Sequence, residues 1–266
     1  PYVGGGSVAL YLLMNNLVKK IIINDKDRSL FAFWHSILHE PEALCKIIED
    51  TPVSMETWYQ QREVQLNKEN EDLLTLGFST FFLNRTNRSG IIKGGVIGGK
   101  NQTGNFLIDA RYNKKDLINR ITDIASFSDR IELHNMDAVD LVHSLKDTLN
   151  QHSFFYFDPP YRPLDATSSF NSYVKESFDD NEQIRLKDFY SDLSAGGCYA
   201  ILSNSDCRGR NVEDDFFDRL YADFFIERVY AKRCINANAA KRGTLTELLI
   251  RNYENYQGEP LNLFNI

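Results

Sequence analysis

The amino-acid sequence predicts an α/β fold: a mostly parallel, Rossmann-like sheet that ends in an antiparallel hairpin and carries an inserted, mainly helical subdomain. Two observations lead to this prediction. Strand-like and helix-like stretches alternate along much of the 266 residues, which is typical of a parallel sheet with helices on both faces. Between residues 27 and 113 the alternation stops, and helical patterns lead into a basic, glycine-rich stretch.

Composition indicates an ordinary globular protein. The chain is 42% hydrophobic, enough for one large core with a smaller insert. No stretch approaches the roughly 20 apolar residues that cross a bilayer, and the first residues lack a charged leader before an apolar run. We therefore expect a cytoplasmic protein without a membrane segment.

His35 and His39 lack a third ligand nearby, so no metal site is expected. The scattered cysteines predict reduced, mostly buried thiols: Cys45, Cys198, Cys207 and Cys234.

The first half of the chain begins as a βα unit after its first strand. The turn Gly4-Gly5-Gly6 precedes an expected helix over residues 7–19 and a strand over 21–23 that ends at Asn24-Asp25. Residues 28–71 have helical spacing, with a break at Thr51-Pro52. Six glycines between residues 85 and 104 exclude a regular helix there and predict surface loops with a hairpin.

Alternation resumes in the second half. Helices are expected over 114–127, 138–149 and 180–193, and strands over 131–134, 154–157 and 199–203. The last two strands, near 225–231 and 246–251, lack a crossover helix between them. They should pair antiparallel at one edge of the sheet.

Charge is distributed unevenly along the chain. The formal net charge of -7 argues against indiscriminate attraction to polyanions. Residues 85–115, however, contain seven lysines and arginines against Asp109 alone. Basic residues interleaved with Asn and Gly suit contacts to phosphates, although a solvated mobile loop would have the same composition.

The glycine turn is the first motif with a chemical meaning. Gly4, Gly6 and Ala9 fit Gly-x-Gly-x-x-Ala, and Asp25 ends the next strand, where an acid can bind both ribose hydroxyls of an adenosine. The pattern predicts a nucleoside cofactor without separating S-adenosylmethionine from NAD or FAD. A tight strand-to-helix corner would also satisfy it.

The second motif is Asp158-Pro159-Pro160-Tyr161, at the carboxyl end of the aromatic strand 154–157, where open α/β sheets bind ligands. Two prolines make the turn stiff and point its carbonyls outward. The N6 amine of adenine is a poor nucleophile. The Asp158 carboxylate and the Pro159 carbonyl can accept both of its N–H bonds and stabilise the charge that develops on nitrogen.

Tyr161 would stack on a base that has left the duplex, since a paired amine cannot reach a buried methyl donor. Alternatively the motif is only a turn, with Asp158 capping the next segment and Tyr161 packed in the core.

Together and in this order, the glycine motif, the Asn24-Asp25 strand end and the Asp158 turn resemble the Dam-like DNA adenine-N6 methyltransferases over nearly the whole chain. The resemblance implies S-adenosylmethionine as cofactor and double-stranded DNA as substrate. It implies Asp158, Pro159, Pro160 and Tyr161 as catalytic residues, with Asp158 also facing the cofactor. The other cofactor-binding residues that it implies are Tyr2, Gly4, Gly6, Ser7, Asp25 and, near the cofactor's adenine, Asp137.

The resemblance also implies a division into domains. Residues 1–26 and 114–266 would form the catalytic domain, and residues 27–113 the target-recognition insert, whose landmarks are residues 81–86 and 104–106. Family members carry a first strand and a Lys-Trp-x-Gly-Gly-Lys-type segment before the glycine turn, so a chain starting at Pro1 is expected to bind S-adenosylmethionine weakly or not at all. The expected DNA contacts are Arg85, Asn87, Arg88, Lys93, Lys100 and Asn101.

Several alternatives stay open at this point. The Asp158 motif also serves amino methylation of cytosine N4 and of RNA, although the order of the motifs favours adenine in DNA. The chain could instead be a DNA-binding protein rather than an enzyme, namely a catalytically impaired subunit of a restriction-modification system. A cognate restriction endonuclease would then be a partner. An NAD-dependent redox enzyme would leave the Asp158 motif without a role.

Overall fold

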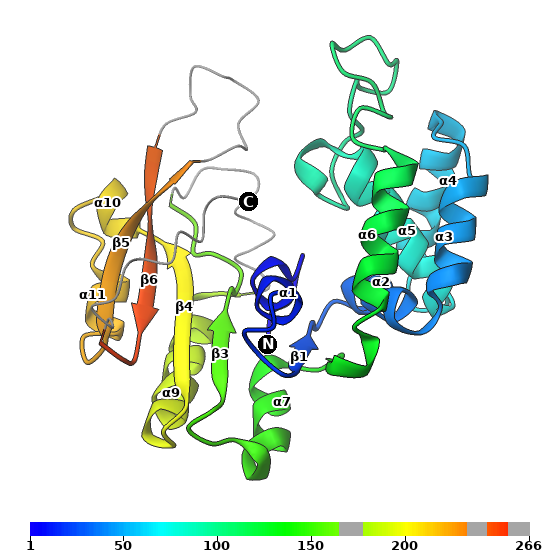
Figure 1. Cartoon of the computed structure of the whole chain (residues 1–266). Coiled ribbons are helices and arrows are strands. Elements are labelled where there is room, and N and C mark those ends of the chain that lie inside the picture. The colour runs from blue at the N-terminus through cyan, green and yellow to red at the C-terminus, as the bar shows by residue number, and fades with distance from the viewer. Residues whose placement is uncertain (165–177, 233–243, 255–266) are drawn as a thin grey trace. The chain divides into compact units, whose positions relative to one another are not determined.

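The computed structural model describes residues 1–164, 178–232 and 244–254 (Figure 1). The chain divides into two compact units, Pro1–Ser144 and Leu145–Ile266. No helix in the described ranges is long and apolar enough to cross a membrane.

The first unit contains a two-stranded parallel sheet and most of the helices. Strand β1 (Ile21–Asn24) pairs with β2 (Ile131–His134), with Ile21 opposite Ile131 and Asn24 opposite His134. The chain between the two strands forms a helical group (Figure 1). The helices of this unit are α1 (Ser7–Met14), α2 (Arg28–His39), α3 (Pro41–Asp50), α4 (Met55–Leu66), α5 (Leu73–Thr86), α6 (Lys114–Ala125) and α7 (Ala138–Leu145), with 3₁₀ turns at Arg88–Gly90 and Ser128–Arg130.

Capping residues divide the helical stretch into separate helices. The side chains of Asp27, Ser54 and Asp72 accept hydrogen bonds from backbone N–H groups in the first turns of α2, α4 and α5, which satisfies donors that a helix start leaves open. Pro41 begins α3, a position that needs no N–H donor. The expected helix break at Thr51-Pro52 is confirmed. A second break, before Pro41, was not expected from the sequence.

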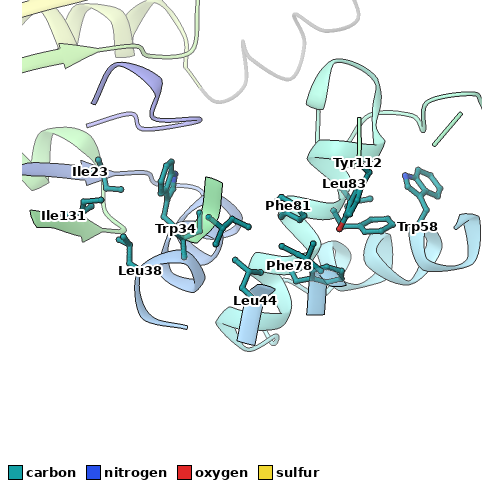
Figure 2. Packing of buried hydrophobic residues seen from close by; sticks show 14 of the residues in the cluster. Ile23, Trp34, Leu38, Leu44, Trp58, Phe78, Phe81, Leu83, Tyr112 and Ile131 are labelled. Atoms are coloured by element: carbon teal, nitrogen blue, oxygen red, sulfur yellow. The ribbon is translucent and has the colours of Figure 1, made fainter. Parts of the chain in front are cut away.

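The core of the first unit extends from Ile23 and Ile131 in the small sheet, through Trp34 of α2, to Trp58 of α4 (Figure 2). Helices α2 and α5 approach closely at Gly77. A Cβ there would lie 2.5 Å from the Ala32 carbonyl oxygen and 2.3 Å from Ser36 Oγ. Glycine is therefore required for this packing.

The second unit is a four-stranded sheet in the order β3-β4-β6-β5 (Figure 1). Strands β3 and β4 are parallel, whereas β6 runs antiparallel to both β4 and β5. The expected C-terminal antiparallel hairpin is confirmed, with β5 at the edge. One continuous parallel sheet through both units stays a prediction. The elements are a 3₁₀ turn (Lys146–Thr148), β3 (Phe154–Phe157), α9 (Asp180–Ala195), β4 (Tyr199–Ser205), α10 (Cys207–Arg210), α11 (Phe216–Leu220), β5 (Phe225–Lys232) and β6 (Thr244–Arg251).

Several helix ends differ from those expected, by two residues in α6 and α9 and by more in α1 and α7. Helix α1 ends at Met14 rather than Lys19, and Asn16 just beyond it adopts a left-handed φ of 54°. Helix α7 ends at Leu145 and gives way to a 3₁₀ turn. Placing Arg85 in a loop was wrong, because α5 continues through Thr86, held by its buried aromatic side chains.

The described cysteines agree with the expectation of reduced thiols. Cys198 and Cys207 are buried, Cys45 is half-buried, and all three are unpaired. Cys234 lies outside the described residues.

Candidate functional site

The glycine turn lies against the end of β1. The Val3 N–H donates to the Asn24 carbonyl (2.8 Å), and the Gly4 N–H donates to Asp25 Oδ2 (3.1 Å). Gly4 and Gly6 have φ values of 45° and 65°, which lie in the left-handed region that favours glycine. The turn and the acid that the sequence predicted are therefore in direct contact.

The side chain of Trp34 packs against the glycine turn. Its Nε1 donates to the Gly4 carbonyl oxygen at 3.0 Å. A Cβ on Gly6 would lie 2.8 Å from the Trp34 ring, whereas a Cβ on Gly4 or Gly5 would meet no atom within 4 Å. The turn is therefore packed on one side and faces open space on the other.

The Asp25 carboxyl is bonded on both oxygens, since Oδ1 also accepts from the Asp27 N–H at 3.0 Å. Burial raises the pKa of Asp25, and the hydrogen bonds from Asp27 and Gly4 partly oppose that rise. Of the other expected cofactor residues, Tyr2 is half-buried and Ser7 is exposed at the start of α1.

Asp137 follows β2, the parallel neighbour of β1, so it lies at the same edge of the small sheet as Asp25. Its Oδ1 accepts from the Val139 N–H (3.1 Å) and its Oδ2 pairs with Lys26 (3.3 Å). Asn24, which belongs to the Asn24-Asp25 strand end that the sequence pointed to, joins the two strand ends. Its fully buried side chain donates to the Met136 carbonyl and accepts from the Met136 N–H, both at 3.0 Å.

The second unit contains the Asp158 turn, directly after β3. Ser203 Oγ, on the adjacent strand β4, donates to Asp158 Oδ1 at 3.0 Å. Asp158 is solvent-exposed as a residue, yet protein atoms crowd its carboxyl group. This desolvation raises the pKa of Asp158, and hydrogen bonds from Ser203 and Tyr161 partly oppose the rise.

The rest of the turn is held by neighbouring side chains. Gln183 Nε2 donates to the Pro160 carbonyl (3.2 Å), and the Arg162 N–H donates to Asn204 Oδ1 (3.0 Å). Within the described part of the chain, no group donates a hydrogen bond to the Pro159 carbonyl. Of the two proline carbonyls, that of Pro160 is the one with a described donor.

Arg162 anchors the turn from its far end. Its guanidinium pairs with Asp180 at the start of α9 (Nε to Oδ1, 2.7 Å) and with Asp214 (Nη1 to Oδ2, 2.7 Å). It also lies over the ring of Phe216, 4.6 Å from the centroid. The Arg162 guanidinium is therefore bound by partners within the protein.

The predicted DNA-contact residues divide into two groups. Arg88, Lys93, Lys100 and Asn101 are exposed, and Arg85 is half-buried at the end of α5. Asn87 is fully buried, and both ends of its side-chain amide are hydrogen-bonded within the protein. This burial disfavours a direct DNA contact by Asn87.

Arg85 belongs to a cluster of like charges. Burial lowers the pKa of Arg85, and the nearby Arg111 and Arg120 lower it further. None of the three arginines forms an ion pair with an acidic residue in the described ranges. Uncompensated positive charge of this kind suits a polyanionic ligand.

Comparison with known proteins identifies the family. Residues 1–235 match the D12 class N6 adenine-specific DNA methyltransferases. The chain belongs to this family. It is 33% identical to the Type II methyltransferase M.MjaIII of Methanocaldococcus jannaschii, covering 95% of this chain and 87% of the relative. It is 27% identical to the Type II methyltransferase M1.LlaDCHI of Lactococcus lactis subsp. cremoris, covering 96% and 86%. It is 25% identical to the DNA adenine methylase of Escherichia coli K12, covering 94% and 84%.

Membership in the D12 class confirms the expected enzyme, an adenine-specific DNA methyltransferase, in preference to a redox enzyme. The family generally uses S-adenosylmethionine and acts on DNA. The individual site residues and the domain boundaries stay predictions, as does the contact of Asp158 with the cofactor.

The sequence reading missed the supports of the Asp158 turn on β4 and α9, namely Ser203, Asn204 and Gln183. A signal for two of them exists in the sequence. The apolar strand β4 ends in the polar run Ser203-Asn204-Ser205-Asp206, and polar residues at the carboxyl end of a strand are typical of ligand sites in α/β sheets.

Proposed function

We propose that this D12-class enzyme transfers the methyl group of S-adenosylmethionine to the N6 amine of adenine at a specific sequence in duplex DNA, after the base has left the helix. The observation that carries the proposal is the acceptor pair after β3. The Asp158 carboxyl is fixed by Ser203, and the neighbouring Pro159 carbonyl has no donor in the described part of the chain.

The glycine turn is the proposed cofactor site. The open space beside Gly4 and Gly5 can receive an adenosine, and the Asp25 carboxyl at its edge can accept from both ribose hydroxyls. Tyr2, Gly6 and Ser7 would line this space, and Asp137 would lie near the adenine ring. When bound there, S-adenosylmethionine supplies an electrophilic methyl group on its sulfonium.

The acceptor pair is suited to an aromatic amine. The Asp158 carboxylate and the Pro159 carbonyl accept one N–H bond each, which favours the pyramidal form of the amine and stabilises the positive charge on nitrogen. The charged form of Asp158 is needed for this. The hydrogen bond from Ser203 keeps that form available although burial raises the pKa of the carboxyl.

Tyr161 supplies an aromatic face beside these acceptors. Its hydroxyl lies close enough to the Asp158 carboxyl to lower the pKa of that group. Stacking of an extruded base on such a ring is worth roughly 1 to 3 kcal/mol. Pro160 has a different task, because its carbonyl is bonded to Gln183 and keeps the turn in place.

The insert, residues 27–113, is the proposed DNA-contact region. Arg88, Lys93, Lys100 and Asn101 are exposed on its glycine-rich segment, and Arg85 belongs to the uncompensated arginine cluster. Lysine and arginine side chains bind phosphates, and some of them read base edges.

A cognate restriction endonuclease is a further proposed partner. Two of the relatives are named Type II methyltransferases. DNA methylated by this enzyme should then resist the nuclease that cuts the same sequence.

The test of the catalytic assignment compares Asp158→Ala with Asp188→Ala, a carboxylate on the exposed side of α9. Asp158→Ala should nearly abolish methylation at saturating cofactor and DNA, whereas Asp188→Ala should methylate at the parental rate. Parental activity of Asp158→Ala would refute the assignment.

Tyr161 is tested separately with 2-aminopurine at the target position, whose fluorescence rises on extrusion and is quenched on an aromatic ring. Tyr161→Ala should lose the quenching and much of the rate, and Tyr161→Phe should retain both. Full quenching with Tyr161→Ala would exclude this residue as the stacking platform.

A further inference from the structure

Asn87 is a fully buried polar residue at the point where α5 ends and the glycine-rich segment begins. Its Nδ2 donates to the carbonyl oxygens of Ile91 (2.9 Å) and Ile92 (2.8 Å), which lie in the following loop. Its backbone N–H bonds the Leu83 carbonyl at 2.8 Å and thereby closes α5. One residue therefore joins the end of a helix to the loop that follows it.

The remaining side-chain atom of Asn87 is held by a distant helix. Trp58 Nε1, on α4, donates to Asn87 Oδ1 at 2.7 Å in a buried environment. Trp58 itself is 4% exposed and belongs to the core cluster (Figure 2). Since a buried amide that loses its partner is costly, this bond couples the position of Asn87 to the helical core.

Arg62, one turn after Trp58 on α4, holds the other side of the loop. Its Nη1 donates to the carbonyl oxygens of Lys93 (3.2 Å) and Gly94 (3.3 Å), and its guanidinium lies 5.4 Å from the centroid of the Trp58 ring. We call these three residues, Trp58, Arg62 and Asn87, the latch.

The loop is also closed at its base by backbone hydrogen bonds. The Arg88 N–H donates to the Gly95 carbonyl and the Ile97 N–H donates to the Thr86 carbonyl, both at 2.9 Å. Between these ends the side chains of Arg88, Ile91 and Lys93 are exposed. The loop thus has carbonyls bound inward to the latch and side chains directed to solvent.

We infer that the latch residues are positioning residues for sequence recognition: they fix loop 88–95 so that its exposed side chains meet base edges in one register. This rests on the proposed role of the insert in DNA contact. Phosphate contacts tolerate small displacements, whereas base readout by directed hydrogen bonds does not. Loss of the latch should therefore reduce discrimination between sequences more than it reduces overall DNA affinity.

The experiment uses Asn87→Ala, which removes all three side-chain hydrogen bonds, and Trp58→Phe, which removes only the indole N–H donor. The control is Ser79→Ala. Ser79 is fully buried and bridges α4 and α5 through Gln61 and Gln65 without touching the loop. All three variants lose buried polar contacts, but only two lose the latch.

Two quantities are measured below the unfolding temperature of each variant. The first is the ratio of kcat/KM on the preferred duplex to that on duplexes with one altered base pair. We expect this ratio to fall about tenfold in Asn87→Ala, the size of one base-pair preference, less in Trp58→Phe, and not at all in Ser79→Ala. The second is hydrogen exchange at the Arg88, Ile91 and Gly94 amides, which should accelerate only in the latch variants.

Each outcome has a distinct meaning. Unchanged hydrogen exchange at the loop amides in both latch variants would show that the latch residues do not fix the loop. Faster exchange with an unchanged kcat/KM ratio would show that loop 88–95 does not read the sequence, and the part of the proposed function that gives recognition to this loop would fail with it. Should Asn87→Ala not fold, the milder Trp58→Phe decides by the same two measurements.

Discussion

Trp34→Phe tests the proposed cofactor site without changing any residue expected to touch the cofactor. The substitution removes the Nε1 donor that bonds the Gly4 carbonyl at 3.0 Å and shortens the ring that packs beneath Gly6. The glycine turn then loses its support on the core side. A buried neutral hydrogen bond contributes about 0.5 to 1.5 kcal/mol, so S-adenosylmethionine should bind about two- to twelvefold more weakly.

The assay is calorimetric titration with S-adenosylmethionine, supported by tryptophan fluorescence. The chain has two tryptophans, Trp34 and Trp58, so Trp58→Phe leaves Trp34 as the only indole. Cofactor binding should change the emission of the Trp58→Phe variant and leave that of Trp34→Phe nearly constant. Equal affinity in Trp34→Phe and the parent, with both folded, would refute the role of Trp34 in shaping the turn.

Three more predictions concern other parts of the chain. Burial raises the pKa of Asp158, so methylation should decline with falling pH at a higher pH than for an ordinary carboxylate. Ser203→Ala removes a donor that lowers this pKa and should move the acid limb of the pH–rate profile higher still; an unmoved limb would contradict this. Tyr112→Phe removes a buried hydroxyl without a partner in the described residues and should raise the free energy of unfolding by up to about 1 kcal/mol in urea titrations. Arg120→Ala should lower the log–log salt slope of DNA binding by about one unit, whereas Lys46→Ala, which removes a lysine paired with an acid, should not; equal slopes would remove Arg120 from the interface.

The sequence predicted best where the determining residues are contiguous. The aromatic strand and the Asp158 motif form one run of eight residues, so the strand end could be predicted from them, and the chemistry proposed for it rests on the same run. Strand β2 and strand β3 were predicted with the bounds that the structure has. Short apolar strands between polar turns leave little freedom in their limits.

Prediction failed where residues distant in the chain decide the outcome. Ser203 meets Asp158 across 45 positions, and Trp58 meets Asn87 across 29, and neither pairing follows from local pattern. Asn87 was expected at the DNA because basic residues interleaved with Asn and Gly suit phosphate contacts. Its burial results from the carbonyls of the loop, which need donors once the loop folds back on the core.

The hydrogen bonds that hold the Asp158 turn also link it to the unfolding of the second unit. The Arg162 amide bonds Asn204 at the end of β4, and Gln183 of α9 bonds both the Pro160 carbonyl and the Asn204 side chain. The turn cannot leave its place without breaking contacts to a central strand and a long helix. The Arg162 amide, which is bonded to Asn204, should therefore exchange together with the amides of β4 as one cooperative unit rather than by local fraying. On heating, the Asp158 turn should keep its place until β4 itself opens and then be lost in the same transition.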